Sequence, residues 1–468
     1  MKEDKKRTEI VIAGFYGPYR GTDTRRCGKS YDYITRDIYE KIKELGINLI
    51  LFNDNDYATD PEAVLADLKY ASEYGIGVYI HDKRLHEKIS DEQRFAYLSD
   101  YNGYKAFRGI ALVDEPFTSY YDETDGGISK YQTHLERRME TYGDIAAFLN
   151  GLPGLCGNIN LLPMIAYLGG EDYAEDYDRY VEEFIATCHP KVLSFDYYVF
   201  AANYAKEHGI EGYFANLAVI RKKALKYGLD FWNFIQTGAN SNDLAADLEP
   251  TDNNVPSLGQ LLWNVNTSLA YGAKGIEYFT LIQPYYYAYE AGGRYDYRRN
   301  GLIGADGMPN KWYGYARRAN RRIAIIGKYL VECVSKAILA VGIHAREWTG
   351  IYENSFGEVG IKDIQCSTPE EGAIVGVMDY AGETALLVVN NDMEKIQTIQ
   401  ILWTERVVCR EIRKGYDGSS ETDIRRMKLE PGDATLLIYH FTAMGEKSYE
   451  KSNGKIEKWE SCHTGFSG

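Results

Sequence analysis

The chain has 468 residues, a length that fits a large barrel joined to a second, smaller domain. Apolar residues make up 45% and charged residues 26%, which are ordinary globular proportions and exclude a disordered chain. The formal net charge of −15 disfavours a nucleic-acid partner or an anionic-membrane partner.

The sequence shows neither targeting nor metal-binding patterns. No apolar run approaches the roughly 18 residues of a membrane helix, and the charged start at residues 1–7 does not resemble a signal peptide. We therefore expect a cytoplasmic protein with no membrane partner. The seven cysteines form no C-x-x-C pair, and the eight histidines show neither H-x-H nor H-E-x-x-H spacing. These patterns predict reduced thiols and indicate no disulfide framework, metal or other cofactor.

A unit made of an amphipathic helix, a glycine and a β-rich run recurs along the first two thirds of the chain. A glycine just past a helix can adopt the left-handed conformation, so a strand can begin directly after it. Asp60 followed by Pro61 predicts the start of the second helix, with Asp60 as its N-cap. The glycines at these junctions are Gly46, Gly75, Gly228 and Gly272.

Eight β-rich runs alternate with these helices. Because the runs are too apolar to have a solvated face, they indicate a parallel sheet covered on its outside. Eight such units predict an α/β fold, a (β/α)₈ TIM barrel over residues 1–335. The alternative, a doubly wound open sheet, would place a Gly-rich phosphate turn after the first strand, where this chain has the aromatic segment 14–19. The runs start near Glu9, Ile47, Ile76, Arg108, Asn158, Val192, Leu229 and Lys274.

The pattern changes after the eighth helix, predicted over residues 311–333. Short β-rich runs follow one another without helices and are separated by turn residues, which predicts an antiparallel β-sandwich accessory domain over residues 336–441. Residues 442–468 form a polar tail that we expect to be mobile. The predicted strands of the accessory domain are 373–378, 384–389, 398–402, 407–412 and 435–439.

The carboxyl ends of the barrel strands carry acids and aromatic residues. Active sites of such barrels are built at these ends. Carboxylates bind sugar hydroxyls, aromatic faces pack against the ring, and two acids can cleave a glycosidic bond. The acids and His81 have a simpler interpretation, as residues that tether loops, and Tyr285 lies in an aromatic run that could pack on itself. The candidate substrate-binding residues are Asp114, Asp54, Asp82, His81, Tyr16, Tyr198, Gln236 and Tyr285.

The fourth strand ends in the adjacent acids Asp114 and Glu115, followed by Pro116. Two acids at the end of an apolar strand are costly unless solvent, hydrogen bonds or function hold them there. Neighbouring strand residues point in opposite directions, so at most one of the two is expected to face the barrel axis. The alternative is that both acids cap the following loop.

The segment 107–116, an apolar strand ending in Asp-Glu-Pro, resembles the fourth strand of the retaining (β/α)₈ glycoside hydrolases of clan A. The rest of the chain is similar to the β-galactosidase-like branch and its uncharacterised relatives, over most of residues 9–441. By this resemblance Glu115 matches the general acid/base. Further matching segments are 192–198, 269–276, 385–391 and 431–433.

Two positions depart from that family. The clan has Asn before the acid/base, where this chain has Asp114, and a Glu nucleophile ending strand seven, where the segment 231–237 contains no acid. The nearest acid is Asp243, in the following loop. We take Asp196, which ends strand six, as the second carboxylate, because other retaining barrels resemble an arrangement with acids on strands four and six. An adjacent Asp-Glu pair also resembles the hexosaminidases, which need no protein nucleophile.

The sequence therefore predicts a glycoside hydrolase that cleaves a small glycan or glycoside, with Glu115 and Asp196 as catalytic acids and a carbohydrate as its substrate. Two alternatives stay open: a sugar-binding barrel that lacks a nucleophile, and a substrate-assisted hexosaminidase using Asp114 and Glu115. The arginines at 317–322 are compatible with a solvated face or a subunit contact, so the chain could form a homo-oligomer.

Overall fold

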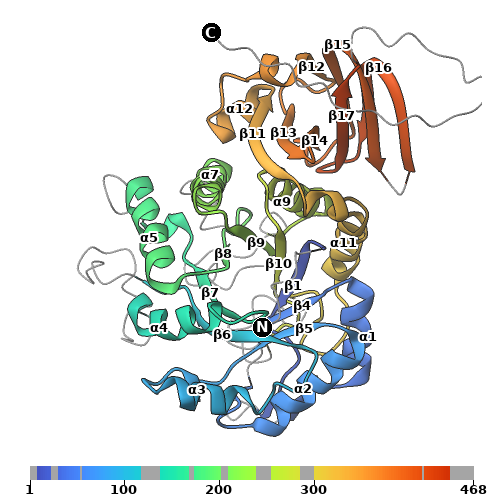
Figure 1. Ribbon diagram of the computed structural model, residues 1–468. Helices are drawn as coiled ribbons and strands as arrows, with labels where there is room; N and C mark the ends of the chain where they lie inside the picture. Colours follow the sequence, from blue (N-terminus) through green and yellow to red (C-terminus); the bar gives the residue numbers. More distant parts are fainter. Residues whose placement is uncertain are drawn as a thin grey trace, which may run out of the picture.

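The computed structural model describes residues 8–22, 30–52, 55–117, 138–167, 173–201, 209–238, 255–284, 300–413 and 416–442. They form an eight-stranded parallel barrel, followed by an antiparallel sheet (Figure 1). In barrel order the strands are β1, β10, β9, β8, β7, β6, β5 and β4, and β4 closes the ring by pairing with β1. The predicted (β/α)₈ fold is confirmed. The barrel strands are β1 (Val11–Phe15), β4 (Leu49–Phe52), β5 (Gly77–Ile80), β6 (Phe107–Asp114), β7 (Cys156–Leu161), β8 (Val192–Phe195), β9 (Asp230–Gln236) and β10 (Gly275–Phe279).

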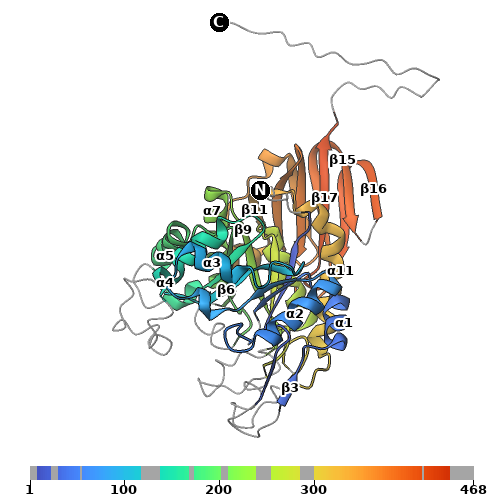
Figure 2. The same ribbon diagram turned by 60° about the horizontal axis from the view of Figure 1, so that its bottom comes forward.

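Helices cover the outside of the barrel (Figures 1 and 2). The predicted helix signals are found where expected: the side chain of Asp60 accepts a hydrogen bond from the Ala63 amide, and Gly46 and Gly75 have the left-handed conformation, with φ of 79° and 69°. The helices around the barrel are α1 (Arg36–Leu45), α2 (Pro61–Tyr74), α3 (Asp91–Leu98), α4 (Met139–Asn150), α5 (Tyr173–Cys188), α7 (Gly209–Tyr227), α9 (Leu258–Ala270) and α11 (Lys311–Leu330). No helix among the described residues is both long and apolar enough to cross a membrane.

The C-terminal strands belong to one seven-stranded antiparallel sheet. The long strand β15 pairs with β12 through its first half and with β17 through its second half, so the sheet bends and its two halves enclose a common apolar core. Residues 398–402 and 407–412, predicted as two strands, are both part of β15, which has a register shift between Leu402 and Val407. The strands are β11 (Val334–Val341), β12 (Ile361–Cys366), β13 (Ala373–Tyr380), β14 (Glu383–Asn390), β15 (Gln397–Arg413), β16 (Tyr416–Leu429) and β17 (Ala434–Phe441).

The sheet packs against α9 and α11 of the barrel (Figure 1). The indole nitrogen of Trp263 in α9 donates to Asn391 Oδ1 at 2.8 Å, and Asn266 Nδ2 donates to the Gly432 carbonyl at 2.8 Å. Arg322 in α11 forms an ion pair with the buried Asp433. The predicted basic face of the last barrel helix is therefore partly a contact within the chain.

Candidate active site

Three acids from two strands meet at the carboxyl end of the barrel. Asp114 is the last residue of β6, Glu115 follows it, and Asp196 follows the last residue of β8. The side-chain amide of Asn160, on the intervening strand β7, donates to Asp114 Oδ1 at 3.0 Å and to Asp196 Oδ1 at 3.3 Å. Asp196 also forms a side-chain hydrogen bond with Glu115. The sequence predicted the carboxyls of Glu115 and Asp196 to work together, and the fold places them within hydrogen-bonding range of each other.

The backbone at Glu115 has an unusual conformation. Its φ is 52°, and its amide donates to the Asn160 carbonyl at 2.9 Å. Tyr16, at the end of β1, has a φ of 59°. The left-handed region is costly for residues with a Cβ, and residues held in it cluster at functional sites. The turn after β6 rotates Glu115 out of the strand alternation, which is how two adjacent acids both reach the cluster.

Burial and charge together raise the pKa of Asp196 to about 7. The main cause is desolvation, since the side chain is 4% exposed, and the second is the neighbouring Asp114 carboxylate. The hydrogen bonds from Asn160 and Glu115 act in the opposite direction. Asp196 is therefore easier to protonate than an ordinary aspartate, although its hydrogen bonds favour the carboxylate.

A second layer of polar residues lies below these acids, in the interior of the barrel. Ser194 precedes Asp196 by two residues and so shares its face of β8. Its Oγ lies 3.0 Å from Asn160 Oδ1 and 2.8 Å from Oε2 of Glu277, which reaches across from β10. Glu277 is fully buried, and burial, with a smaller effect of Asp114, raises its pKa to about 8.

Sequence reasoning missed Asn160, Ser194 and Glu277. The available signal was a charged residue at the centre of an otherwise apolar strand, since Glu277 is flanked by the fully buried Ile276 and Tyr278. A buried carboxyl needs a partner or a function. The strand ends alone do not reveal this layer.

Aromatic rings line the mouth beside the acids. Tyr16 packs against Phe52 and Phe279, with ring centroids 5.7 and 5.9 Å apart, and Tyr198 lies 5.4 Å from Phe279. Tyr16, Phe52 and Phe279 are partly exposed, and Tyr198 is nearly buried. These rings offer apolar surface for the carbon face of a ligand.

Asp82 is fully buried and occupied within the protein. Its oxygens accept three hydrogen bonds from the Arg84 guanidinium and one from the Tyr101 hydroxyl at 2.9 Å. It also caps the short 3-10 helix at Lys83–Leu85 by accepting from the Arg84 amide at 3.1 Å. We therefore leave Asp82 out of the proposed site, because a sugar hydroxyl would have to displace these partners. It is a loop-tethering acid.

The remaining predicted residues differ in position. His81 lies against Phe52, with ring centroids 5.5 Å apart, and burial lowers its pKa. Gln236, at the end of β9, is buried and donates to the Gly238 carbonyl at 2.7 Å. Asp54, Tyr285 and Asp243 lie outside the described residues. The segment 231–237 brings no acid to the mouth, as its sequence predicted.

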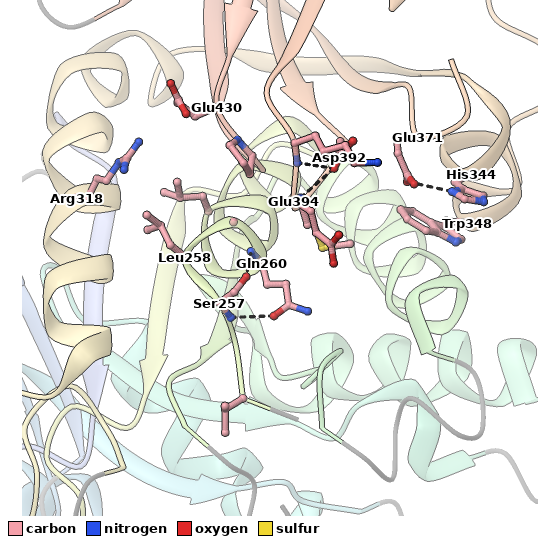
Figure 3. A pocket seen from close by; sticks show the side chains of 16 residues that line it. Ser257, Leu258, Gln260, Arg318, His344, Trp348, Glu371, Asp392, Glu394 and Glu430 are labelled. Carbon is pink, nitrogen blue, oxygen red and sulfur yellow. Dashed lines mark hydrogen bonds and ion pairs between the residues drawn. The ribbon is translucent and has the colours of Figure 1, made fainter. Parts of the chain in front are cut away.

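A cavity of about 860 Å³ lies elsewhere, between the start of α9 and the C-terminal domain (Figure 3). Several of its polar side chains are bound within the protein: His344 Nδ1 pairs with Glu371 at 3.0 Å, and Asp392 accepts from the amides of residues 394 and 395. Ser257 and Gln260 form the capping box of α9. Because these side chains are already bonded to neighbours within their own part of the chain, the cavity is not our candidate site. Within the described residues, no three His, Cys, Asp or Glu are grouped as metal ligands.

No family model and no curated protein matches the sequence. Similar solved structures include a β-galactosidase from Bacillus circulans sp. alkalophilus (TM-score 0.44, 9% identity, 93% of this chain and 100% of that chain). Others are a putative α-galactosidase/melibiase from Bacteroides fragilis (0.46, 10%, 92% and 79%) and xylanase 10B from Thermotoga maritima (0.37, 12%, 67% and 95%). Their names are those of glycoside hydrolases, the class that the sequence resembles. At these identities, what supports an activity is the arrangement of this chain's own residues.

Proposed function

We propose that the protein is a glycoside hydrolase that cleaves a small glycan or glycoside with the carboxyl pair Glu115 and Asp196. The observation that carries this proposal is the hydrogen bond between these two side chains at the carboxyl end of the barrel. Such a bond requires one proton for two carboxyls. A protonated acid beside a carboxylate is the chemical equipment of glycoside hydrolysis.

The contact between the carboxyls favours a retaining mechanism. Inverting enzymes hold their acids about 6.5–9.5 Å apart to admit a water, whereas retaining enzymes need about 5–5.5 Å. A pair that touches without substrate reaches the shorter separation by a small movement as the sugar enters. The longer one would require the strand ends to part.

The hydrogen bond with Glu115 lowers the pKa of Asp196, so Glu115 is the donor of the pair and Asp196 the acceptor. In this arrangement Glu115 is the acid and Asp196 is the carboxylate that the nucleophilic role requires. Glu115 then gives the proton to the glycosidic oxygen as the bond from that oxygen to the anomeric carbon breaks, and Asp196 forms the new bond to the same carbon. Water, deprotonated by Glu115, releases the sugar in the second step.

The aromatic residues at the mouth, with Asp114, are assigned to substrate binding. Tyr16, Phe52 and Phe279 provide the ring-packing surface, and Tyr198 supports Phe279. Asp114 is ordered by Asn160 and partly exposed, so it can accept from sugar hydroxyls. Loops at this end of a barrel set the choice of sugar.

The test is hydrolysis of aryl glycosides of galactose, glucose, fucose, xylose and N-acetylhexosamine, in both anomers, by the wild type, Glu115→Gln and Asp196→Asn. Loss of the acid should lower turnover by at least about 10²-fold for a poor leaving group, and much less for dinitrophenol, which needs no proton. Loss of the nucleophile in Asp196→Asn should abolish turnover of glycosides with either kind of leaving group. The reverse pattern would exchange the two roles.

Two further outcomes would replace the proposal. Turnover of only the N-acetylhexosaminide that survives Asp196→Asn would indicate the substrate-assisted reaction of Asp114 and Glu115. Sugar binding in calorimetry without turnover, unchanged in Glu115→Gln, would indicate a binding protein.

A further inference from the structure

The hydrogen bonds below the acids can be assigned a direction. The Asn160 Nδ2 atom reaches oxygens of both Asp114 and Asp196, so the amide must present its NH₂ group to them. Its Oδ1 atom then faces Ser194 Oγ at 3.0 Å and must accept. Ser194 has a single hydroxyl hydrogen, and this geometry assigns that hydrogen to Asn160.

That assignment leaves Ser194 Oγ as an acceptor toward Glu277. The two oxygens lie 2.8 Å apart, so the hydrogen between them has to come from Glu277. The other oxygen of Glu277, Oε1, is buried and has no hydrogen-bond partner among the described residues. A buried oxygen without a hydrogen bond costs far more free energy in a carboxylate than in a neutral carboxylic acid. Both observations are explained if Glu277 is protonated.

We propose that Glu277 is a neutral acid whose proton orients the chain Glu277–Ser194–Asn160 and thereby positions Asp114 and Asp196 for the proposed reaction. Glu277 is fully buried and one layer below the acids, so it is a positioning residue and does not touch the substrate. This inference rests on the proposed function for its catalytic consequence, but the protonation of Glu277 can be tested without it.

The surroundings of Glu277 support the neutral form. Its register partners on the adjacent strands are apolar, Ala13 of β1 and Phe234 of β9. Across the barrel it faces Ser194 of β8 and, among the described charged groups, Asp114 of β6. Burial among these apolar residues is the main cause that raises the pKa of Glu277 to about 8. The negative Asp114 raises it further, and the hydrogen bond with Ser194 acts in the opposite direction.

Deprotonation of Glu277 would reverse the direction of the hydrogen bond between Glu277 and Ser194. An ionised Glu277 accepts, so Ser194 would donate to it and leave Asn160 Oδ1 without a donor inside the barrel. The amide could then no longer be held with both N–H groups on the two aspartates. We expect the active arrangement to be lost as pH rises through the pKa of Glu277.

Three variants separate this role from simple packing. Glu277→Gln keeps a hydrogen-bond donor toward Ser194 and cannot ionise. Glu277→Leu removes the donor at similar side-chain size, and Ser194→Ala removes the hydroxyl that links Glu277 to Asn160. On the aryl glycoside that the wild type cleaves, we expect Glu277→Gln to be active, and Glu277→Leu and Ser194→Ala to lose about 10²-fold in kcat/KM, as misplaced catalytic groups do.

The shape of the pH profile is the decisive activity measurement. Above about pH 8 the wild type should lose activity more steeply than tenfold per pH unit, because a second proton is lost. Glu277→Gln should fall only tenfold per unit. Profiles of the same shape, or a Glu277→Leu variant as active as Glu277→Gln, would overturn the proposal.

Infrared difference spectroscopy tests the proton directly, whether or not any glycoside is cleaved. The measurement is made in the Asp196→Asn background, which removes the proton-sharing pair of Glu115 and Asp196. A protonated-carboxyl band should be present there near pH 7, be absent when Glu277→Gln is added, and disappear above pH 8. Its absence would refute the inference. Its presence without turnover of any glycoside would refute only the proposed function.

Discussion

The buried carboxyl at position 277 should make the stability of the protein depend on pH in a defined direction. Its pKa is about 8 in the fold and 4.5 when unperturbed. Between these values the folded chain binds more protons than the unfolded chain, so the free energy of unfolding falls as pH rises. Below pH 4.5 the contribution is fully present, and above pH 8 it has been lost.

The magnitude follows from the width of this window. Each pH unit within it changes the free energy of unfolding by about 1.4 kcal/mol. We therefore expect the difference in stability between Glu277→Gln and the wild type to grow, in favour of the variant, by about 4 kcal/mol from pH 5 to pH 8. The glutamine is the reference because it mimics the neutral acid at every pH.

Urea unfolding followed by tryptophan fluorescence, at intervals of half a pH unit, measures this difference. Subtracting the two curves removes the contributions of all other titrating groups, Asp196 included. Glu87→Gln, a change at an exposed carboxylate, is the matched control for the loss of one acid. A difference that stays constant from pH 5 to pH 8 would show that position 277 is ionised in the fold and would contradict a neutral Glu277.

Three further variants test the backbone at Glu115, the contact between the two domains and the role of Asp82. Glu115→Gly should relieve the strain of the left-handed backbone conformation and raise the free energy of unfolding by about 1 kcal/mol, while turnover is lost. A variant that is less stable than the wild type would contradict this strain. Asn391→Leu should leave the Trp263 indole unpaired at the domain contact and lower stability by about 1–3 kcal/mol in chemical denaturation, with KM unchanged. Asp82→Ala should leave Arg84 paired with Asp100 alone among the described acids, remove the acceptor of the buried Tyr101 hydroxyl and cost about 3 kcal/mol; a changed KM in the folded variant would return Asp82 to the substrate site.

The barrel could be predicted because its local signals agree with one another. The cap at Asp60, the glycines after the helices and the eight apolar runs all placed elements where the structure has them. The same reasoning located Asp114, Glu115 and Asp196, because the carboxyl ends of parallel strands meet at one end of a barrel.

What could not be predicted depends on contacts across the barrel or on solvated strands. The chain from Asn160 to Glu277 joins three strands far apart in the sequence. Strands β11, β12 and β16 were not predicted. Within the described part of the chain β16 pairs with β15 alone, and it carries many exposed polar residues, so it lacks an apolar run. The burial of Asp82 depends on Arg84, whose role no strand-end pattern reveals.

The apolar core does not end where the barrel ends. Buried residues from the inner face of the C-terminal sheet, among them Leu387, Val389 and Leu436, belong to the same contiguous cluster as those of the barrel. At the centre of this contact the glycine at position 376 lies so close to α9 that an added Cβ would meet the Ala270 carbonyl oxygen at 2.1 Å. The second domain thus covers the outer faces of α9 and α11, two helices that surround the barrel. The C-terminal domain therefore differs from a domain joined only by a flexible linker. Its removal would expose hydrophobic surface on both the barrel and the sheet.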